Sequence, residues 1–209
     1  MSSPRGRLIT LEGGEGAGKS TQARFVAGWL EERGRTVVQT REPGGSPLAE
    51  AVRAVVLGDW AEGVSPETEL LLMFAARAAH VAHRIEPALR AGHDVVCDRF
   101  IDASWAYQGA GRGVADEHLR ALERLALRDL RPDLTLVFDL PPDVGLARAR
   151  GRGDANRFEA ENLAFMERVR AAYLSRAQAD PDRYVVLDAT RSIDEVKAHI
   201  ASILASRLA

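Results

Sequence analysis

The most constraining feature of this sequence is a glycine-rich segment at residues 13–20, which reads GGEGAGKS. It matches the pattern G-x-x-x-x-G-K-[ST], in which backbone N–H groups and a helix N-terminus surround phosphate oxygens. An apolar run typical of a strand precedes it at 7–12, and a run with helical apolar spacing follows it at 20–34. This order of strand, glycine loop and helix predicts a site for the phosphates of a nucleotide.

Two side chains close the loop and are predicted to do its chemistry. Lys19 is expected to reach the β- and γ-phosphates, and the Ser20 hydroxyl is expected to ligate Mg²⁺. A glycine-rich turn without a ligand is the alternative, and the complete motif in its complete context disfavours it. The remaining nucleotide-binding positions are Gly13, Gly14, Glu15, Gly16, Ala17, Gly18 and Thr21.

Composition limits the class of protein. The chain has 209 residues, of which 46% are hydrophobic and 28% charged, as expected of one globular domain. Its net charge of −2 gives no reason to expect nucleic acid as a partner. Because no apolar run reaches membrane-spanning length and no secretion signal is visible, we expect a cytoplasmic protein without a membrane partner. The single cysteine, Cys97, is expected to be buried and structural.

Strand and helix patterns alternate along the chain. Further strands are predicted at 35–40, 93–98, 133–140 and 183–189. Helices are predicted at 47–57, 65–92, 116–127, 161–179 and 194–208, and another begins within 143–150. Ser65 and Asp116 are the predicted N-caps of their helices. Five strands separated by helices predict an α/β fold, with a parallel sheet covered on both faces and ligands at the carboxyl ends of its strands.

Charged residues follow the predicted strands. Asp98 ends the strand at 93–98, and such a carboxylate reaches Mg²⁺, usually through water, when a phosphate loop is present. On its own, an aspartate at a strand end is more often a cap or turn residue. Arg99 comes next, where a phosphate-bearing acceptor would bind. After the second strand, Arg41, a Pro-Gly-Gly turn and Arg53 form another candidate anion site, although Arg53 alone would be taken as a solvated helix residue.

A basic segment at 148–157 reads RARGRGDANR. The simple interpretation is a solvated loop. We favour a lid that closes over the nucleotide and stabilises charge on the transferred phosphoryl group, since the phosphate loop offers only Lys19 for that task. The arginines of the segment are Arg148, Arg150, Arg152 and Arg157.

The segment at 98–113 combines aromatic, amide and hydroxyl side chains with glycines. Such side chains beside a phosphate site suit recognition of a nucleobase by stacking and edge hydrogen bonds, although each one alone could belong to the core or a turn. They are Ser104, Trp105, Tyr107 and Gln108.

Taken together, these motifs resemble those of the thymidylate kinases, and the resemblance spans nearly the whole chain. The carrying segments are LEGGEGAGKSTQ (11–22), TREPGGSPLAEAVR (40–53), FAARAAH (74–80), DRFIDASWAYQGAGRG (98–113), RPDLTLVFDLPPDVGLARARGRG (131–153) and VLDAT (186–190). The resemblance implies the P-loop nucleoside monophosphate kinase fold in one domain over 1–209, with an arginine-rich lid at about 148–158. It also implies ATP and dTMP as substrates, Mg²⁺ as cofactor and a homodimer.

The resemblance also implies roles for individual residues. Glu15 would help to position the acceptor sugar, and Arg53 and Arg99 would hold the dTMP phosphate. Arg77 and Ser104 would address the thymine edge. The full substrate-binding set is Glu42, Arg53, Met73, Phe74, Arg77, Arg99, Ser104, Tyr107 and Gln108.

On the donor side, the chain is similar to bacterial members of the family, because its loop carries no arginine. Catalytic arginine would then come from the lid, with Arg150 and Arg152 as the first choices. Arg191, after the last strand, would pack on the adenine. The catalytic set is Lys19, Glu15, Asp98, Arg150 and Arg152.

The chain departs from the family pattern at a few positions. Met73 stands where a phenylalanine is usual, with Phe74 one step on, so either Met73 covers the thymine or the helix register shifts. Phe100 replaces a tyrosine, Ala103 a serine and Asn156 an aspartate. The first three keep a kinase for dUMP, dCMP or dGMP open as an alternative.

Two functions of a different class are also considered. A GTP-dependent switch would need an N-K-x-D segment, and the only asparagines are Asn156 and Asn162. A structural protein with a vestigial loop would have no reason to keep Lys19, Ser20 and Asp98 together with a basic lid.

Overall fold

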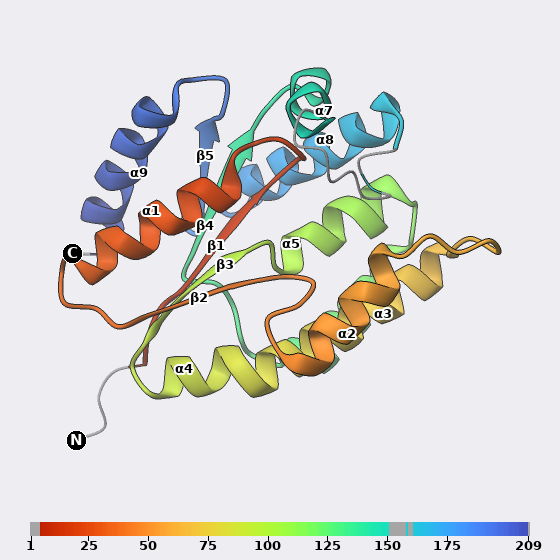
Figure 1. Cartoon of the computed structure of the whole chain (residues 1–209), viewed down its shortest axis with the longest axis horizontal. Coiled ribbons are helices and arrows are strands. Elements are labelled where there is room, and N and C mark those ends of the chain that lie inside the picture. Colours follow the sequence, from red (N-terminus) through yellow and green to blue (C-terminus); the bar gives the residue numbers. More distant parts are fainter. Residues whose placement is uncertain (1–4, 151–157, 159–160, 209) are drawn as a thin grey trace.

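The computed structural model describes residues 5–150, 158 and 161–208. A parallel sheet lies at its centre, with the strand order β2-β3-β1-β4-β5 (Figure 1). The predicted α/β fold with a five-stranded parallel sheet is therefore confirmed. The strands are β1 (Leu8–Gly13), β2 (Val37–Arg41), β3 (Asp94–Asp98), β4 (Leu134–Asp139) and β5 (Tyr184–Asp188).

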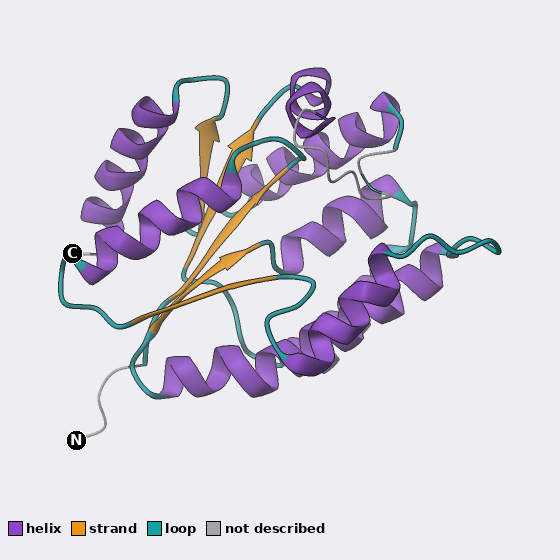
Figure 2. Cartoon of the chain, viewed as in Figure 1, coloured by secondary structure: helices purple, strands orange, loops and turns teal. Residues whose placement is uncertain are grey.

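Helices cover both faces of the sheet (Figure 2). On one face, α1 and α9 pack over apolar side chains such as Ile9 and Leu11 of β1. On the other face, α8 packs against β1, β4 and β5, and α4 packs against β3. The helical elements are α1 (Lys19–Glu31), α2 (Pro47–Leu57), α3 (Pro66–His80), the π-helical η1 (Val81–Ile85), α4 (Glu86–Arg90), α5 (Ile101–Ser104), the π-helical η2 (Trp105–Gly111), α6 (Asp116–Leu127), α7 (Pro142–Arg150), α8 (Leu163–Ala179) and α9 (Ile193–Leu208).

The helix predicted at 65–92 is helical from Pro66 to Arg90, but η1 interrupts it with a wider turn. Its start is confirmed, because the Ser65 side chain accepts a hydrogen bond from the Thr68 N–H. The cap predicted at Asp116 is wrong. The N-cap is Ala115, and Asp116 lies in the first turn, where a carboxylate favours the helix N-terminus and pairs with Arg120.

The segment at 98–113, for which no helix was predicted, forms α5 and η2. Tertiary packing explains this, because η2 lies against α8 and its glycines let other elements approach. A Cβ atom on Gly111 would meet the Phe165 ring at 2.6 Å, and one on Gly109 would meet Leu119 at 2.9 Å. Cys97 is buried in the core as predicted.

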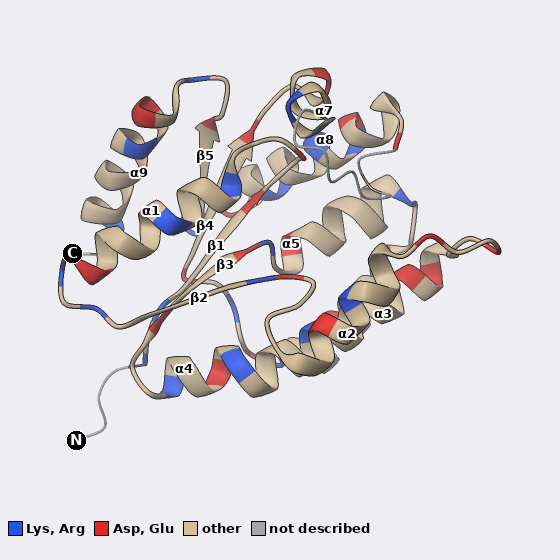
Figure 3. Ribbon diagram, in the orientation of Figure 1, with Lys and Arg blue, Asp and Glu red and all other residues tan. Residues whose placement is uncertain are grey.

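The carboxyl ends of the strands meet at one edge of the sheet, where the phosphate loop follows β1. Acidic residues end three of the strands there: β3 ends in Asp98, β4 in Asp139 and β5 in Asp188 (Figure 3). Helices of the described residues are all too short or too polar to cross a bilayer.

Candidate active site

The glycine loop folds as its motif requires. Gly16 has a φ of +70°, and a Cβ atom there would lie 2.1 Å from the Gly145 carbonyl oxygen, so only glycine fits. Lys19 folds back over the loop, and its Nζ donates to the carbonyl oxygens of Gly13 at 3.1 Å and Gly14 at 2.7 Å. Burial lowers the pKa of Lys19 to about 8, and Arg99 adds to the shift. The loop thus carries a buried ammonium ready to meet an anion.

Ser20 and Asp98 come together beside this ammonium. The Ser20 hydroxyl donates to Asp98 Oδ2 at 2.7 Å, which joins the start of α1 to the end of β3. A hydroxyl and a carboxylate oxygen are hard ligands that suit Mg²⁺. Among the described residues no three acidic, histidine or cysteine side chains form a metal cluster.

Arg99 has a left-handed backbone, with a φ of +66°, and its N–H donates to the Leu11 carbonyl at 2.9 Å. Its guanidinium donates to Glu15 Oε1 at 2.6 Å, to the Gly13 carbonyl at 2.9 Å and to the Tyr173 hydroxyl at 3.4 Å. Although burial opposes the charge, Glu15 and its neighbours hold the pKa of Arg99 well above its ordinary value. The structure therefore anchors a permanent cation next to the loop.

Glu12, which the sequence did not single out, lies beneath this arginine. Its carboxylate accepts from the Phe100 N–H at 2.7 Å and from the Tyr173 hydroxyl at 2.9 Å. Burial, with Asp102 adding to it, raises the pKa of Glu12 to about 7. Glu12 thus fixes the backbone of Phe100, directly after Arg99. It also fixes the Tyr173 hydroxyl, which the Arg99 guanidinium contacts. The sequence signal that could have identified Glu12 is a carboxylate at the end of an otherwise apolar predicted strand.

The second anion site lies after β2. Arg53 Nη1 donates to the Pro43 carbonyl at 2.8 Å, where the Glu42–Pro43 peptide bond is cis. Burial, followed by the nearby charge of Arg41, lowers the pKa of Arg53. Burial therefore disfavours the charged form of Arg53, and an anionic ligand would offset this.

Glu42 and Arg77 form a buried pair behind this turn. Arg77 Nε donates to Glu42 Oε2 at 2.7 Å, and His80 Nδ1 lies 3.0 Å from Glu42 Oε1. Arg77 also donates to Ser104 Oγ and to the Phe100 carbonyl, each at 2.9 Å. Its side chain is 1% exposed. Arg77 thus ties α3 to the turn after β2 and to α5 from behind the cleft, and its predicted contact with a base stays a prediction.

One cleft joins these groups. It holds about 990 Å³ of empty space, part of which is open solvent. Met73 lines it, whereas Phe74 lies in the core with its ring 4.8 Å from the Arg77 guanidinium. The Tyr107 hydroxyl, also at the cleft, donates to Glu15 Oε1 at 3.2 Å. The lining residues with predicted roles are Glu15, Gly16, Ala17, Gly18, Lys19, Ser20, Thr21, Glu42, Arg53, Met73, Asp98, Arg99, Tyr107 and Gln108.

The predicted lid is described only at its borders. Arg148 on α7 donates to the Ala189 carbonyl at 3.0 Å, which joins α7 to the end of β5. Arg150 ends α7. The predicted lid residues Arg152, Asn156 and Arg157 lie outside the described residues. Arg191 is exposed after β5, with its Nε 3.4 Å from Asp188.

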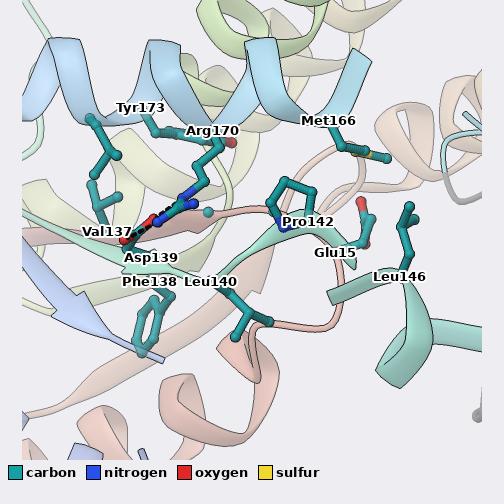
Figure 4. Close-up of a pocket in the computed structure, with 13 residues that line it drawn as sticks. Glu15, Val137, Phe138, Asp139, Leu140, Pro142, Leu146, Met166, Arg170 and Tyr173 are labelled. Atoms are coloured by element: carbon teal, nitrogen blue, oxygen red, sulfur yellow. Dashed lines mark hydrogen bonds and ion pairs between the residues drawn. The ribbon is translucent and has the colours of Figure 1, made fainter. Parts of the chain in front are cut away.

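A smaller cavity lies on the other side of the loop, between β4, α7 and α8 (Figure 4). Arg170 projects into it from α8 and binds Asp139 through two hydrogen bonds of 2.6 and 2.9 Å. The Glu15 side chain faces it from the loop. Neither Arg170 nor Asp139 was predicted, because a pair 31 residues apart has no sequence signal.

Comparison with known proteins agrees with this geometry. The family model described as "Thymidylate kinase" matches residues 11–200. The chain belongs to the thymidylate kinase family. It is 57% identical to a thymidylate kinase of Pseudomonas putida strain F1 and 54% identical to one of Pseudomonas syringae pv. tomato, over 95% of each chain. The crystal structure of a thymidylate kinase from Ehrlichia chaffeensis matches 96% of this chain and 99% of its own, with 32% identity and a TM-score of 0.78.

Thymidylate kinases are transferases of nucleotide biosynthesis that phosphorylate dTMP with ATP. Membership of this family therefore excludes the two alternatives considered from the sequence, a GTP-dependent switch and a structural protein with a vestigial loop.

Proposed function

We propose that this chain transfers the γ-phosphoryl group of ATP to dTMP and forms ADP and dTDP in this cleft. The observation that carries the proposal is that Lys19 of the phosphate loop and the two cations Arg53 and Arg99 line the same cleft. The attacking group is an oxygen of the dTMP phosphate, which is already ionised near neutral pH. The protein therefore needs to align two anions and stabilise charge, and it needs no strong base.

On the donor side, Lys19 would leave its carbonyl partners and neutralise charge on the β- and γ-phosphates. Ser20 and Asp98 would hold Mg²⁺, which when bound neutralises charge on the phosphates. The lid at about 148–158, with Arg150 and Arg152, would supply further positive charge to the transferred group. Arg191 would pack on the adenine.

On the acceptor side, Arg53 and Arg99 would hold the dTMP phosphate in line with the γ-phosphate. Glu15, bound by Arg99 and Tyr107, would position the sugar. Met73 would cover the base, because it lines the cleft and Phe74 does not. Arg77 and Ser104 would address the thymine edge with Gln108 nearby, and Glu42 and Phe74, which contact Arg77, would help to hold it there.

The proposal extends to organisation and partners. The chain would act as one kinase domain over 1–209 on two free nucleotides, ATP and dTMP, in the cytoplasm, without nucleic acid or membrane as a partner. The net charge of −2 supports this, because a nucleic-acid-binding surface calls for a basic chain.

We further propose a homodimer, as the family resemblance implies. Large apolar side chains are exposed on three helices that pack in the order α2, α3, α6: Leu48 is 60%, Leu71 57% and Leu125 77% exposed. Light scattering should give about twice the 22.7 kDa of one chain. Leu71→Asp should shift the protein to monomer, whereas Ile193→Asp on α9 should not. A wild-type monomer at micromolar concentration would refute the dimer.

The activity is tested by coupled measurement of ADP release with ATP and Mg²⁺ against dTMP, dUMP, dCMP, dGMP and no acceptor. We expect rapid turnover of dTMP and its loss when Mg²⁺ is chelated. Preference for another monophosphate would overturn the substrate, and absence of turnover with every acceptor would overturn the proposed reaction.

A further inference from the structure

A buried polar network lies behind the base side of the cleft. Glu69 on α3 is fully buried, and its Oε1 accepts from Nε2 of Gln108 on η2 at 2.6 Å. Arg112 lies on the other side of the same carboxylate, with its Nη2 3.2 Å from Oε2. Arg112 also pairs with Glu161 at 2.6 Å. Neither Glu69 nor Arg112 is among the described residues that line the cleft, so their influence on a ligand would pass through Gln108.

The network fixes which end of the Gln108 amide faces Glu69. An ionised carboxylate has only acceptors, so it can take the amide nitrogen but not the amide oxygen. Although burial opposes the charge, Glu69 and Glu161 raise the pKa of Arg112, so that a permanent guanidinium stays beside the carboxylate. The orientation of the Gln108 amide thus follows from the charge of the Glu69 carboxylate. It does not depend on the assignment of the amide oxygen and nitrogen positions.

The oxygen end of the Gln108 amide takes no part in this network. Gln108 lines the cleft, and its buried Oε1 has no hydrogen-bond partner in the part of the chain that the structure describes. A buried amide oxygen without a partner is costly, since desolvation is not repaid by a hydrogen bond. A donor on a bound base would supply the missing bond. The site therefore contains an acceptor whose direction the Glu69 carboxylate has fixed.

We propose that Glu69, held by Arg112, is a positioning residue that orients the Gln108 oxygen toward the base and so makes the site selective for bases with a hydrogen on ring nitrogen 3. The inference rests on the proposed function and deepens it. Thymine and uracil carry that hydrogen. Cytosine has a lone pair at the same position, which would meet the Gln108 oxygen as one acceptor facing another.

Glu69→Gln tests this role with almost no change in shape. The new amide can present its own N–H to Gln108, so the Gln108 amide can turn over and offer its nitrogen to the base. We expect the ratio of kcat/KM for dTMP to that for dCMP to fall about 10- to 100-fold, which corresponds to about one hydrogen bond. The ratio for dTMP to dUMP should change less than about twofold, because both bases carry the same hydrogen.

Glu67→Gln is the matched control, since it makes the same substitution on an exposed residue in the first turn of the same helix. It should leave both ratios at wild-type values. An unchanged ratio of dTMP to dCMP in a folded Glu69→Gln variant would overturn the positioning role. Wild-type protein without turnover of dTMP would instead overturn the proposed function itself, so the two failures are distinguishable.

Gln108→Met is a second variant, which tests the proposal if Glu69→Gln does not fold. It removes the acceptor while Glu69 keeps its pairing with Arg112. Calorimetric titration should show dTMP binding weakened about 10-fold or more and dCMP binding nearly unchanged. Equal weakening of both nucleotides would mean that Gln108 only fills space, and the proposal would fall.

Discussion

Lys19→Ala should lower kcat about 1,000-fold while the Kd for dTMP changes less than about threefold. Removing one preorganised charge that stabilises a transition state costs about 3–4 kcal/mol. Lys19 contacts the carbonyl oxygens of the donor loop and no described acceptor-side residue by a hydrogen bond, so the dTMP site should stay intact.

The comparison for this substitution is Lys197→Ala, which changes the other of the two lysines in the sequence. Lys197 lies on α9 and pairs only weakly with Asp194, so the variant should have wild-type kcat and Kd. Titration calorimetry for dTMP and the coupled assay for turnover give the two quantities separately. Parallel loss of turnover and dTMP binding in Lys19→Ala would show that Lys19 does not act on the donor side alone.

The lowered pKa of Lys19 also sets an expected pH dependence. The group is protonated below about pH 8 and loses its proton as the pH rises through that value. Since only the ammonium attracts phosphates, kcat/KM for ATP, which reports on the free enzyme, should fall above about pH 8. Lys19→Arg should remove this fall, because a guanidinium keeps its proton, even if its turnover is reduced. A flat wild-type profile up to pH 9.5 would contradict the role of the buried ammonium.

Arg99→Lys is the second change with a large expected effect. Lysine keeps the charge but cannot reach Glu15, the Gly13 carbonyl and a phosphate at once, as the guanidinium fork can. Losing one charge-assisted hydrogen bond of about 1.5–3 kcal/mol should raise the KM for dTMP about 10- to 100-fold. The KM for ATP should change little.

Steady-state kinetics with each substrate varied in turn measures this difference. Arg120→Lys makes the same substitution on the exposed surface of α6, where the pair with Asp116 is solvated, and it should behave as wild type. If Arg99→Lys raised the KM for ATP as much as that for dTMP, Arg99 would belong to both sides of the site.

Much of the fold could be predicted, because its signals are local. The alternation of apolar strands and helices gave all five strands, and the Ser65 cap and the glycine loop were each contained in a few neighbouring residues. Local signals also had limits. The cap at Asp116 was placed one residue too late, and the helical segment at 101–111 was missed because burial against α8 stabilises it more than its own composition does.

By itself, the sequence determined the glycine loop and the family, and it singled out Ser20 and Asp98, since motif order and spacing fix which groups stand at the strand ends. Only the tertiary structure decided how those groups are held. Glu12 beneath Arg99 and Glu69 behind Gln108 are buried carboxylates whose partners come from distant parts of the chain. Folding decided that Met73 and not Phe74 faces the cleft as well, because the packing of α3 sets the rotation of the helix. Such contacts join residues through space, so no pattern of neighbours along the chain encodes them.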